Sequence, residues 1–358
     1  MNMIGFGSHL PREGFYIDPI FSIVRTIFHP VPTILLSVYA ETVSGGLLSS
    51  FKNGLLLSAL LSAALWINDF LTKWSRNNWV RDTTWAWGKE IVMVTGGSSG
   101  IGASIVNRLA DDGVSVVVVD IAPLTYKIEN KPVRFYNCDL SDEEEVRFIC
   151  GRIKAEVGYP TVLVNNAGLS RGQMIVDGSY SDNLVTLKTN LLAPFLLIKE
   201  FLPSMIERNH GHIVNISSLS AYMPPAGLAD YSASKAGMIA LHEALGLELK
   251  YCHNSPKVRT SLAVLSFTDT PLFKGELNSS HFIAPLMHVD TVGDAIVDTI
   301  YSGYGRTIHL PGISKCFAGI RGAPEWVHRA FLGFSKSLKI DFKGRQRIDQ
   351  ITGRVYHV

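Results

Sequence analysis

From residue 89 onward, short apolar runs alternate with polar segments and with stretches of helical periodicity. The runs are rich in β-branched residues, as in strands buried on both faces of a parallel sheet. They cover residues 90–95, 114–120, 132–137, 161–164, 212–216 and 258–265, and residues 101–111 have the first helical pattern between them. This alternation predicts an α/β fold: a single Rossmann-type, doubly wound parallel sheet with helices on both faces.

An apolar segment with few charges, residues 17–71, precedes this pattern. The apolar pattern of residues 17–40 is interrupted by Arg25, Pro30 and Pro32. Residues 54–67 carry no charge, and the next charged residue is Asp69. Those fourteen residues would extend about 21 Å as a helix, short of the roughly 30 Å hydrocarbon core of a bilayer. Extension back to Ser44 supplies the length but places Lys52 within the span. We interpret the segment as a membrane anchor, spanning or re-entrant, with a helical hairpin packed on the protein as the alternative.

Aromatic and basic residues surround the end of the apolar segment. Five of the six tryptophans fall between Trp66 and Trp87, with Lys73, Arg76 and Arg81 among them. Indole rings favour the membrane–water interface, and basic residues beside an apolar run favour the cytosolic side. We therefore expect an interfacial linker and a catalytic domain that faces the cytosol, at the endoplasmic reticulum or a lipid droplet. The alternative is that the tryptophans belong to the core of the domain.

A third pattern begins after residue 312. Val327, Phe331, Phe334 and Leu338 share one helical face. This amphipathic extension has three interpretations: a membrane-surface contact, a helix that closes a substrate pocket, or a helix packed on its own domain. The expected regions are the anchor and linker (1–88), the Rossmann-type domain (89–312) and the extension (313–358).

Composition changes this picture little. The chain has 33 Lys and Arg against 31 Asp and Glu, which gives no indication of a nucleic-acid partner, and we expect none. The hydrophobic share of 47% is concentrated at the N-terminus, in agreement with an anchor. The cysteines have neither metal-ligand spacing nor a disulfide pattern, so we expect no metal site, and buried free thiols in a reducing compartment at Cys138, Cys150, Cys252 and Cys316.

A glycine-rich segment, Thr95-Gly96-Gly97-Ser98-Ser99-Gly100-Ile101-Gly102, connects the first predicted strand to the first predicted helix. Glycine lets the backbone approach a pyrophosphate closely, and a helix N-terminus offers free N–H groups and a positive dipole end. The flanking strand and helix make the motif more specific than a lone glycine pattern. We expect a dinucleotide site at Gly96, Ser98, Ser99, Gly100, Ile101 and Gly102.

Polar residues follow the next predicted strands. Asp120 ends the second strand, where a carboxylate can accept hydrogen bonds from the adenosine ribose hydroxyls. Asp139 and Leu140 follow the third strand and Asn166 the fourth, at the sheet edge where open α/β sheets bind ligands. Since no cation lies in the glycine-rich loop or directly after Asp120, we expect NAD as cofactor, with NADP as the alternative.

Tyr231 and Lys235 lie at i and i+4 on one face of a predicted helix. A nearby cation favours the phenolate and lowers a tyrosine pKa, which makes the phenol a proton donor or acceptor for an alcohol/carbonyl pair. Ser218 ends a predicted strand thirteen residues earlier, where its hydroxyl can bind a substrate oxygen. Asn190, in a helix expected to begin near Asp182, can hold a water that connects Lys235 to solvent.

Together, loop 95–102, Asn165–Gly168, Asn190, Ser218 and Tyr231-x-x-x-Lys235 resemble the short-chain dehydrogenase/reductase family from Lys89 to roughly Gly312. The resemblance implies Tyr231 as the acid/base and Lys235 as its pKa-lowering, ribose-binding partner. It also implies Ser218 as the binder of the substrate oxygen and Asn190 as the proton-relay residue.

Residues 120–121 and 135–141 are similar to the membrane-associated retinol and 17β-hydroxysteroid dehydrogenase group, whose members carry an apolar N-terminal anchor. The resemblance implies hydride transfer between NAD(H) and a lipophilic alcohol or ketone, such as a retinoid, steroid or other lipid, and a homodimer is a further expectation. Two alternatives stay open: an NADPH-dependent reductase of a lipid-biosynthetic ketone, and a catalytically silent nucleotide-binding or interaction protein.

One segment departs from the family pattern. After the sixth strand the family has Pro-Gly and then a threonine that helps to hold the nicotinamide carboxamide, whereas residues 265–270 read LSFTDT, with Thr270 in the threonine's place. The following residues, 271–287, form the expected substrate loop. We expect its apolar side chains to form a pocket wall: Leu272, Phe273, Phe282, Ile283 and Leu286.

Overall fold

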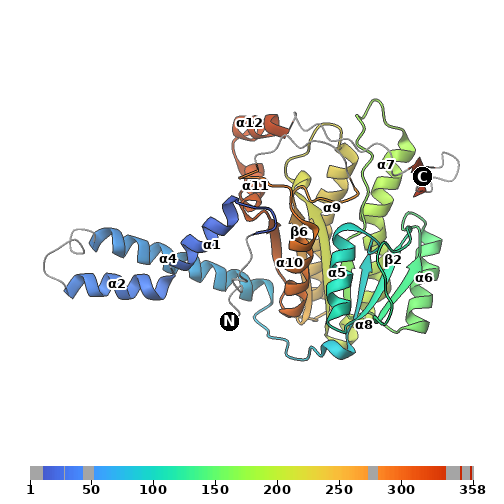
Figure 1. The fold of residues 1–358 in the computed structure, drawn as a ribbon, viewed down its shortest axis with the longest axis horizontal. Helices are drawn as coiled ribbons and strands as arrows, with labels where there is room; N and C mark the ends of the chain where they lie inside the picture. Colours follow the sequence, from blue (N-terminus) through green and yellow to red (C-terminus); the bar gives the residue numbers. More distant parts are fainter. Residues whose placement is uncertain are drawn as a thin grey trace. The chain divides into compact units, whose positions relative to one another are not determined.

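In the part of the chain that the structure describes, seven parallel strands form one sheet in the order β3-β2-β1-β4-β5-β6-β7 (Figure 1). The computed structural model describes residues 11–27, 29–42, 52–272, 281–335, 347–348 and 355–356. The strands are β1 (Ile91–Thr95), β2 (Ser115–Asp120), β3 (Val133–Asn137), β4 (Val162–Asn165), β5 (Gly211–Ser218), β6 (Val258–Leu265) and β7 (Thr307–Leu310). The sheet confirms the predicted doubly wound architecture, because the strand order reverses between β1 and β4.

The central strands are apolar on both faces, as their uninterrupted β-branched runs predicted. Val116 to Val119 of β2 are at most 1% exposed and alternate between two hydrophobic clusters. Helices α6 (Glu143–Glu156), α8 (Ala193–Arg208) and α9 (Ala229–Leu247) contribute to one cluster, and α5 (Gly100–Asp111) and α10 (Val289–Tyr301) to the other. Helices therefore cover both faces of the sheet.

The predicted and observed strands differ mainly at the edges. β7 was not predicted, because its residues, TIHL, are each only partly buried and form no apolar run. β5 is longer than residues 212–216 at both ends, since Gly211 and Ser218 also pair with β6. The remaining elements are short or lie between these: η1 (Trp87–Lys89), α7 (Tyr180–Leu187), η2 (Lys188–Leu192), η3 (Leu219–Ala221), η4 (Glu248–Cys252), η5 (Gly312–Ser314), α11 (Lys315–Ala318), η6 (Ile320–Gly322), α12 (Glu325–Ser335) and the antiparallel pair β8 (Arg347–Ile348) and β9 (Val355–Tyr356).

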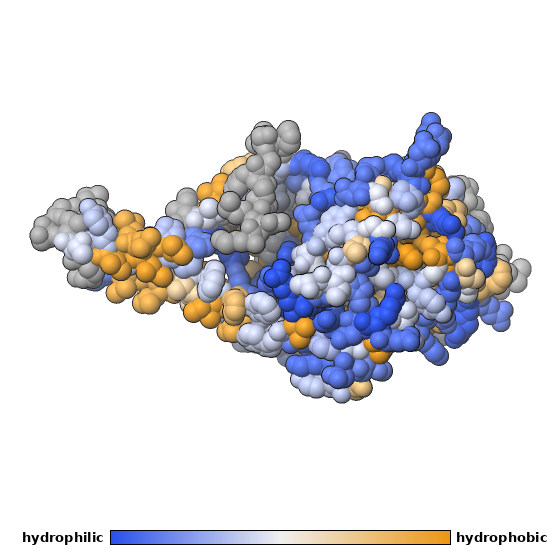
Figure 2. All heavy atoms as spheres, turned by 90° about the horizontal axis from the view of Figure 1, so that it is seen from below, coloured by the Kyte–Doolittle hydropathy of each residue, from blue (hydrophilic) through white to orange (hydrophobic). Residues whose placement is uncertain are grey.

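The N-terminal unit, Met1–Trp79, contains α1 (Ile17–Ile27), α2 (Pro30–Thr42) and α4 (Lys52–Arg76). α2 and α4 pack against each other, and the residues buried within this unit include small ones: Thr33, Ser37, Ala40, Ala59 and Ser62. Large apolar side chains of both helices are exposed and give this unit its orange surface in Figure 2. Among the described residues, α4 begins at Lys52 and extends forward to Arg76, beyond the uncharged residues 54–67. The considered extension back to Ser44 falls outside the described residues.

Among the described residues, two helices are long and apolar enough to cross a membrane, Asn53–Arg76 and Tyr180–Arg208, and the bent pair α1–α2 would be a third if it is one span. Tyr180–Arg208 comprises α7, η2 and α8 of the larger unit, and its Leu197, Phe201 and Met205 are buried in the sheet's core. Asn53–Arg76 is 11% buried over its apolar window. The candidate membrane segments of the N-terminal unit are therefore α4 and, if it is one span, the bent pair α1–α2.

The larger unit begins at Val80, ahead of the expected boundary at Lys89. Trp85 stacks on Trp87 with ring centres 5.2 Å apart, and Trp87 meets Tyr301 edge to face at 4.7 Å. Both indoles pack against the core cluster of α5 and α10. The expectation that they belong to a membrane-interface linker is therefore wrong for these two residues, because their rings pack against the core cluster and Trp87 contacts Tyr301 of α10.

A cluster of His210, Asp82 and Glu90, here called the His210 clasp, also attaches the segment before β1 to the sheet. The Nδ1 atom of His210 lies 3.1 Å from Oδ2 of Asp82, and its Nε2 atom lies 3.3 Å from Oε2 of Glu90. The ring centre of Trp85 lies 4.2 Å from that of His210. The two carboxylates raise the pKa of His210 through hydrogen bonds and charge, and His210 in turn helps to lower the pKa values of Asp82 and Glu90.

Two smaller expectations are corrected in part. Cys138 and Cys150 are buried free thiols as expected, whereas Cys252 and Cys316 are exposed because they lie on surface turns of η4 and α11. In the C-terminal extension, Phe331 of α12 meets Phe317 of α11 edge to face at 6.5 Å. This part of the extension thus packs on its own chain; the Phe334 side chain and Leu338 lie outside the described residues.

Candidate active site

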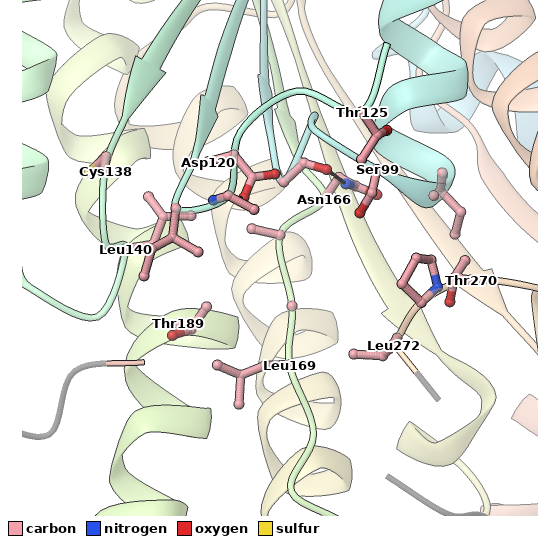
Figure 3. Close-up of a pocket in the computed structure, with 18 of the residues that line it drawn as sticks. Ser99, Asp120, Thr125, Cys138, Leu140, Asn166, Leu169, Thr189, Thr270 and Leu272 are labelled. Carbon is pink, nitrogen blue, oxygen red and sulfur yellow. Dashed lines mark hydrogen bonds between the residues drawn. The ribbon is translucent and has the colours of Figure 1, made fainter. Parts of the chain in front are cut away.

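A pocket opens at the carboxyl ends of β1, β2, β3 and β4, where open α/β sheets bind ligands. Figure 3 shows Asp120 and Leu140 on one side of it, Thr270 and Leu272 on the other, and Asn166 between them. Most of the residues predicted to bind cofactor line it: Gly96, Ser99, Gly100, Ile101, Asp120, Asp139, Leu140, Asn166 and Thr270. Ser98 and Gly102 do not line the pocket.

Gly96 and Gly102 of the glycine-rich loop leave no room for a Cβ atom. Gly96 has a φ of +63°, and a Cβ atom there would lie 2.8 Å from the Cα atom of Ala167. A Cβ atom on Gly102 would lie 2.1 Å from the carbonyl oxygen of Gly96. α5 begins at Gly100, directly after this turn, so its free N–H groups lie at the pocket.

Two polar side chains next to the loop, Asn166 and Asp139, differ in how fully they are hydrogen-bonded. Asn166 Nδ2 donates to the carbonyl oxygens of Thr95 and Gly96, each at 3.0 Å, so the amide holds the loop. Asp139 Oδ1 accepts from the Ser141 backbone at 2.8 Å, while its buried Oδ2 has no hydrogen-bond partner among the described residues. An unsatisfied buried carboxylate oxygen on a pocket wall favours a ligand that brings a hydrogen-bond donor.

Ser218, Tyr231 and Lys235 come together beside this pocket. Ser218 ends β5, and Tyr231 and Lys235 occupy successive turns near the start of α9. The Ser218 hydroxyl lies close enough to the Tyr231 phenol to influence its pKa. The Lys235 ammonium lies 5.6 Å from the centre of the Tyr231 ring and donates to the Ile216 carbonyl oxygen at 2.9 Å.

Burial dominates the protonation of this pair. It raises the pKa of Tyr231, and the neighbouring Ser218 hydroxyl offsets this in part. Burial also lowers the pKa of Lys235 to about 8. In this structure desolvation is the largest effect, so the pKa of Tyr231 is raised, whereas a lowered value was expected from the nearby Lys235.

Asn190 is fully buried in η2, a turn of π-helix between α7 and α8. Its Oδ1 accepts from the Leu169 backbone N–H at 2.8 Å, and its Nδ2 donates to the Leu169 carbonyl at 2.8 Å and to Ser234 Oγ at 3.1 Å. The side chain thus connects the segment after β4 to α9. Both N–H groups of Nδ2 have protein partners, whereas Oδ1 keeps a second lone pair that is available to the predicted water. α7 begins at Tyr180, close to the expected start near Asp182.

Sequence reasoning missed a second connection to α9. The buried Thr186 hydroxyl on α7 donates to Asp230 Oδ2 at 2.7 Å, and Asp230 Oδ1 accepts the Tyr231 backbone N–H at 2.7 Å. Ser217 Oγ, at the end of β5, donates to the Lys235 carbonyl at 2.8 Å. An acidic residue at a helix start is a recognisable sequence signal for Asp230, whereas nothing in the sequence indicates Thr186.

The predicted substrate wall is only partly in place. Leu272 lines the pocket, next to Thr270. Phe282, Ile283 and Leu286 are between 38% and 45% exposed and do not line it. Phe273 lies outside the described residues.

Residues 90–280 match the family model for short chain dehydrogenases. The chain belongs to this family. The dehydrogenase is 39% identical over 210 residues to Dehydrogenase RED2 of Cochliobolus heterostrophus, covering 58% of this chain and 78% of that protein. It is 39% identical over 148 residues to human Retinol dehydrogenase 10, covering 41% of this chain and 42% of that protein.

A solved structure of 4-hydroxyisoleucine dehydrogenase complexed with NADH matches the fold, with a TM-score of 0.55 and 23% identity, covering 62% of this chain and 97% of that one. The family membership and the similarity to retinol dehydrogenases confirm the predicted resemblance. As a member of the short-chain dehydrogenases, the chain is an oxidoreductase acting on CH–OH groups.

Proposed function

We propose that this short-chain dehydrogenase transfers a hydride between NAD(H) and a lipophilic alcohol or ketone of retinoid, steroid or other lipid type, at a membrane surface. The observation that carries the proposal is that Ser218, Tyr231 and buried Lys235 come together next to the pocket at the glycine-rich loop. In this assignment the catalytic residues are Asn190, Ser218, Tyr231 and Lys235.

The pocket fits a nicotinamide dinucleotide, which supplies or accepts the hydride when bound. The N-terminus of α5 would hold the pyrophosphate and Asp120 the adenosine ribose. The unpartnered Oδ2 of Asp139 can accept the adenine amino group. Thr270 would contact the nicotinamide carboxamide. Because no lysine or arginine is among the described lining residues, the pocket favours NAD over NADP.

The chain's own groups can move the proton that accompanies the hydride. Since burial favours the neutral Tyr231 phenol, it can donate a proton to a substrate oxygen in reduction. In oxidation the phenolate form of Tyr231 would accept the proton of the alcohol. The Ser218 hydroxyl would hold that oxygen. Lys235 would bind the cofactor ribose, and Asn190 would maintain the path for proton exchange by fixing the Leu169 segment against α9.

A membrane location suits a lipophilic substrate. α2 packs on α4, small residues of this unit are buried, and large apolar side chains of both helices are exposed. This arrangement is typical of helices in a bilayer. Lys73 and Arg76 in the last turn of α4 favour a cytosolic orientation of the dehydrogenase domain. We place the protein at the endoplasmic reticulum or a lipid droplet, with three regions at 1–88, 89–312 and 313–358.

The exposed Leu192, Phe195, Leu247 and Tyr251 suit a homodimer.

The test is a substrate screen with the full-length protein in detergent micelles. We expect reduction of NAD by at least one retinoid, steroid or long-chain alcohol, followed by the absorbance of the reduced cofactor, and no activity in the Tyr231→Phe variant. Faster oxidation of NADPH by a lipid ketone would instead support the biosynthetic reductase. Nucleotide binding without turnover of any alcohol or ketone would contradict the proposal and support a silent nucleotide-binding protein.

A further inference from the structure

The segment that follows β2 folds back on the glycine-rich loop and is held there by three side-chain hydroxyls. The Thr125 hydroxyl donates to the Ser98 carbonyl oxygen at 2.6 Å. The Ser98 hydroxyl donates to the Ala122 carbonyl oxygen at 2.7 Å. The Tyr126 hydroxyl donates to the Gly97 carbonyl oxygen at 2.8 Å. We refer to Ser98, Thr125 and Tyr126 as the latch.

The latch also orients Asp120. The backbone N–H of the fully buried Ser98 donates to Asp120 Oδ2 at 2.9 Å, and the Ala122 N–H donates to Asp120 Oδ1 at 3.0 Å. Each carboxylate oxygen keeps a further lone pair for a ribose hydroxyl. The carboxylate, the glycine-rich loop and the segment after β2 are therefore fixed in one arrangement.

The two forms of the cofactor place different demands on this arrangement. A ribose 2′-hydroxyl needs one hydrogen-bond acceptor, whereas a 2′-phosphate brings three anionic oxygens that need both space and donors. Ile121, Ala122, Pro123 and Thr125 form the pocket wall beside Asp120. We propose that the latch, acting with Asp120, selects NAD against NADP by holding this wall closed where a 2′-phosphate would lie. The inference deepens the proposed NAD-dependent function and rests on it.

The latch and the charge of Asp120 make separable contributions. Replacing Asp120 removes the repulsion of a phosphate and the two backbone hydrogen bonds to its carboxylate, but it leaves all three latch hydrogen bonds, which still hold the wall. Replacing the latch hydroxyls frees the wall but leaves the repulsion. Thr125 also donates its backbone N–H to the Ser98 carbonyl at 3.1 Å, so any single latch substitution loosens the segment only in part. A full change of cofactor preference then requires both sets of substitutions.

The experiment measures dissociation constants of NADH and NADPH by fluorescence for the full-length protein in detergent micelles. The variants are Asp120→Ala, the triple latch variant Ser98→Ala/Thr125→Val/Tyr126→Phe, and the combination of all four. A matched control, Thr299→Val/Tyr301→Phe, removes two hydroxyl hydrogen bonds of α10 that do not reach the pocket. Competition by AMP and by adenosine 2′,5′-bisphosphate repeats the comparison on the adenosine half alone.

We expect the wild-type and control proteins to prefer NADH by about tenfold or more, equivalent to ~1.4 kcal/mol. Each partial variant should keep a reduced preference of about threefold, and the combined variant should bind both cofactors equally well. Equal affinities in Asp120→Ala alone, or an unchanged ratio when the latch substitutions are added to it, would overturn the latch. Equal affinities in the wild-type protein would overturn the NAD preference itself and the latch with it.

General destabilisation cannot imitate the expected result, because it changes both affinities and leaves their ratio constant. Should the triple latch variant fail to fold, Thr125→Val added to Asp120→Ala provides the same comparison. The ratio must then fall below that of Asp120→Ala alone for the latch to stand.

Discussion

Thr186 on α7 donates a hydrogen bond of 2.7 Å to Asp230, the residue directly before Tyr231 on α9. The same carboxylate accepts the backbone N–H of Tyr231 at 2.7 Å. Thr186 is fully buried and Asp230 is partly buried, and hydrogen bonds to a charged group are stronger than those between neutral groups. α7 therefore helps to position the start of α9 and, with it, the phenol of Tyr231.

Replacing Thr186 with Val should lower kcat about tenfold, because a lost hydrogen bond to a charged group costs about 1.5–3 kcal/mol and displaces the phenol from the substrate oxygen. The KM for the cofactor should change little, since Thr186 does not line the pocket. Steady-state kinetics with the best substrate measures both, with Thr299→Val as the control. A lower melting temperature with unchanged kcat would show that the role of Thr186 is purely structural.

Replacing Tyr231 with Phe should lower turnover by several orders of magnitude and leave nucleotide affinity nearly unchanged, because the phenol acts in proton transfer. Replacing Lys235 with Ala should reduce both, since the ammonium is assigned to the ribose as well. Turnover assays and NADH fluorescence titration separate the two effects. A Tyr231→Phe protein with more than a tenth of wild-type activity would show that another group transfers the proton.

The His210 clasp should give the protein a stability maximum in mildly acidic solution. Because the pKa of His210 is raised in the fold, its contribution is complete below about pH 6.5 and is lost as the pH rises through the raised value. The pKa values of Asp82 and Glu90 are lowered, so their contributions are complete above about pH 4.5 and are lost on further acidification.

Thermal unfolding of the full-length protein between pH 5 and pH 8 tests this linkage. The melting temperature should fall as the pH rises through this range, and the His210→Gln variant should be less stable at pH 5 and show a flatter profile. His253, an exposed histidine on the same unit, offers the control His253→Gln. Parallel pH profiles for wild type and His210→Gln would rule the clasp out as the source.

Membrane attachment should depend on the N-terminal unit, and the point of truncation should matter. The full-length protein should sediment with membranes and resist extraction by salt or alkali, because burial of apolar surface is not screened by ions. A chain that starts at Val80 should be soluble and keep the clasp. A chain that starts at Gly88 should lose Asp82, Trp85 and Trp87 and melt at a clearly lower temperature.

Recovery of the full-length protein in a salt-washed soluble fraction would argue against an anchor. Equal melting temperatures of the two truncated chains would show that the segment before β1 adds nothing to the larger unit.

The sequence was informative wherever one local pattern decides the structure. Four consecutive valines fixed β2 as a buried strand, and glycine spacing located the turn at Gly96 and Gly102. The partners Ser218, Tyr231 and Lys235 were found because their spacing and order are characteristic of a family. In each case the information lies within a few residues of the chain or in a recognised motif.

Long-range contacts carried no such signal. Thr186 and Asp230 are 44 residues apart, and Thr125 and Ser98 are 27 apart. Trp85 and Trp87 were assigned to a membrane interface because composition cannot tell an interfacial indole from one that covers an edge of the core. The pKa of Tyr231 was expected to fall because a nearby lysine is visible in the sequence, whereas the burial that raises it is not.

The positions of the strands along the chain set the order in which parts of the sheet can form during synthesis. β1 pairs with β4 about 70 residues later, and β6 pairs with β7 only after residue 307 is made. At ~5–20 residues per second, roughly 10–50 seconds separate completion of α4 from completion of β7. The apolar helix therefore leaves the ribosome long before the sheet can close, so that the dehydrogenase domain folds after its N-terminal segment has had time to meet a bilayer.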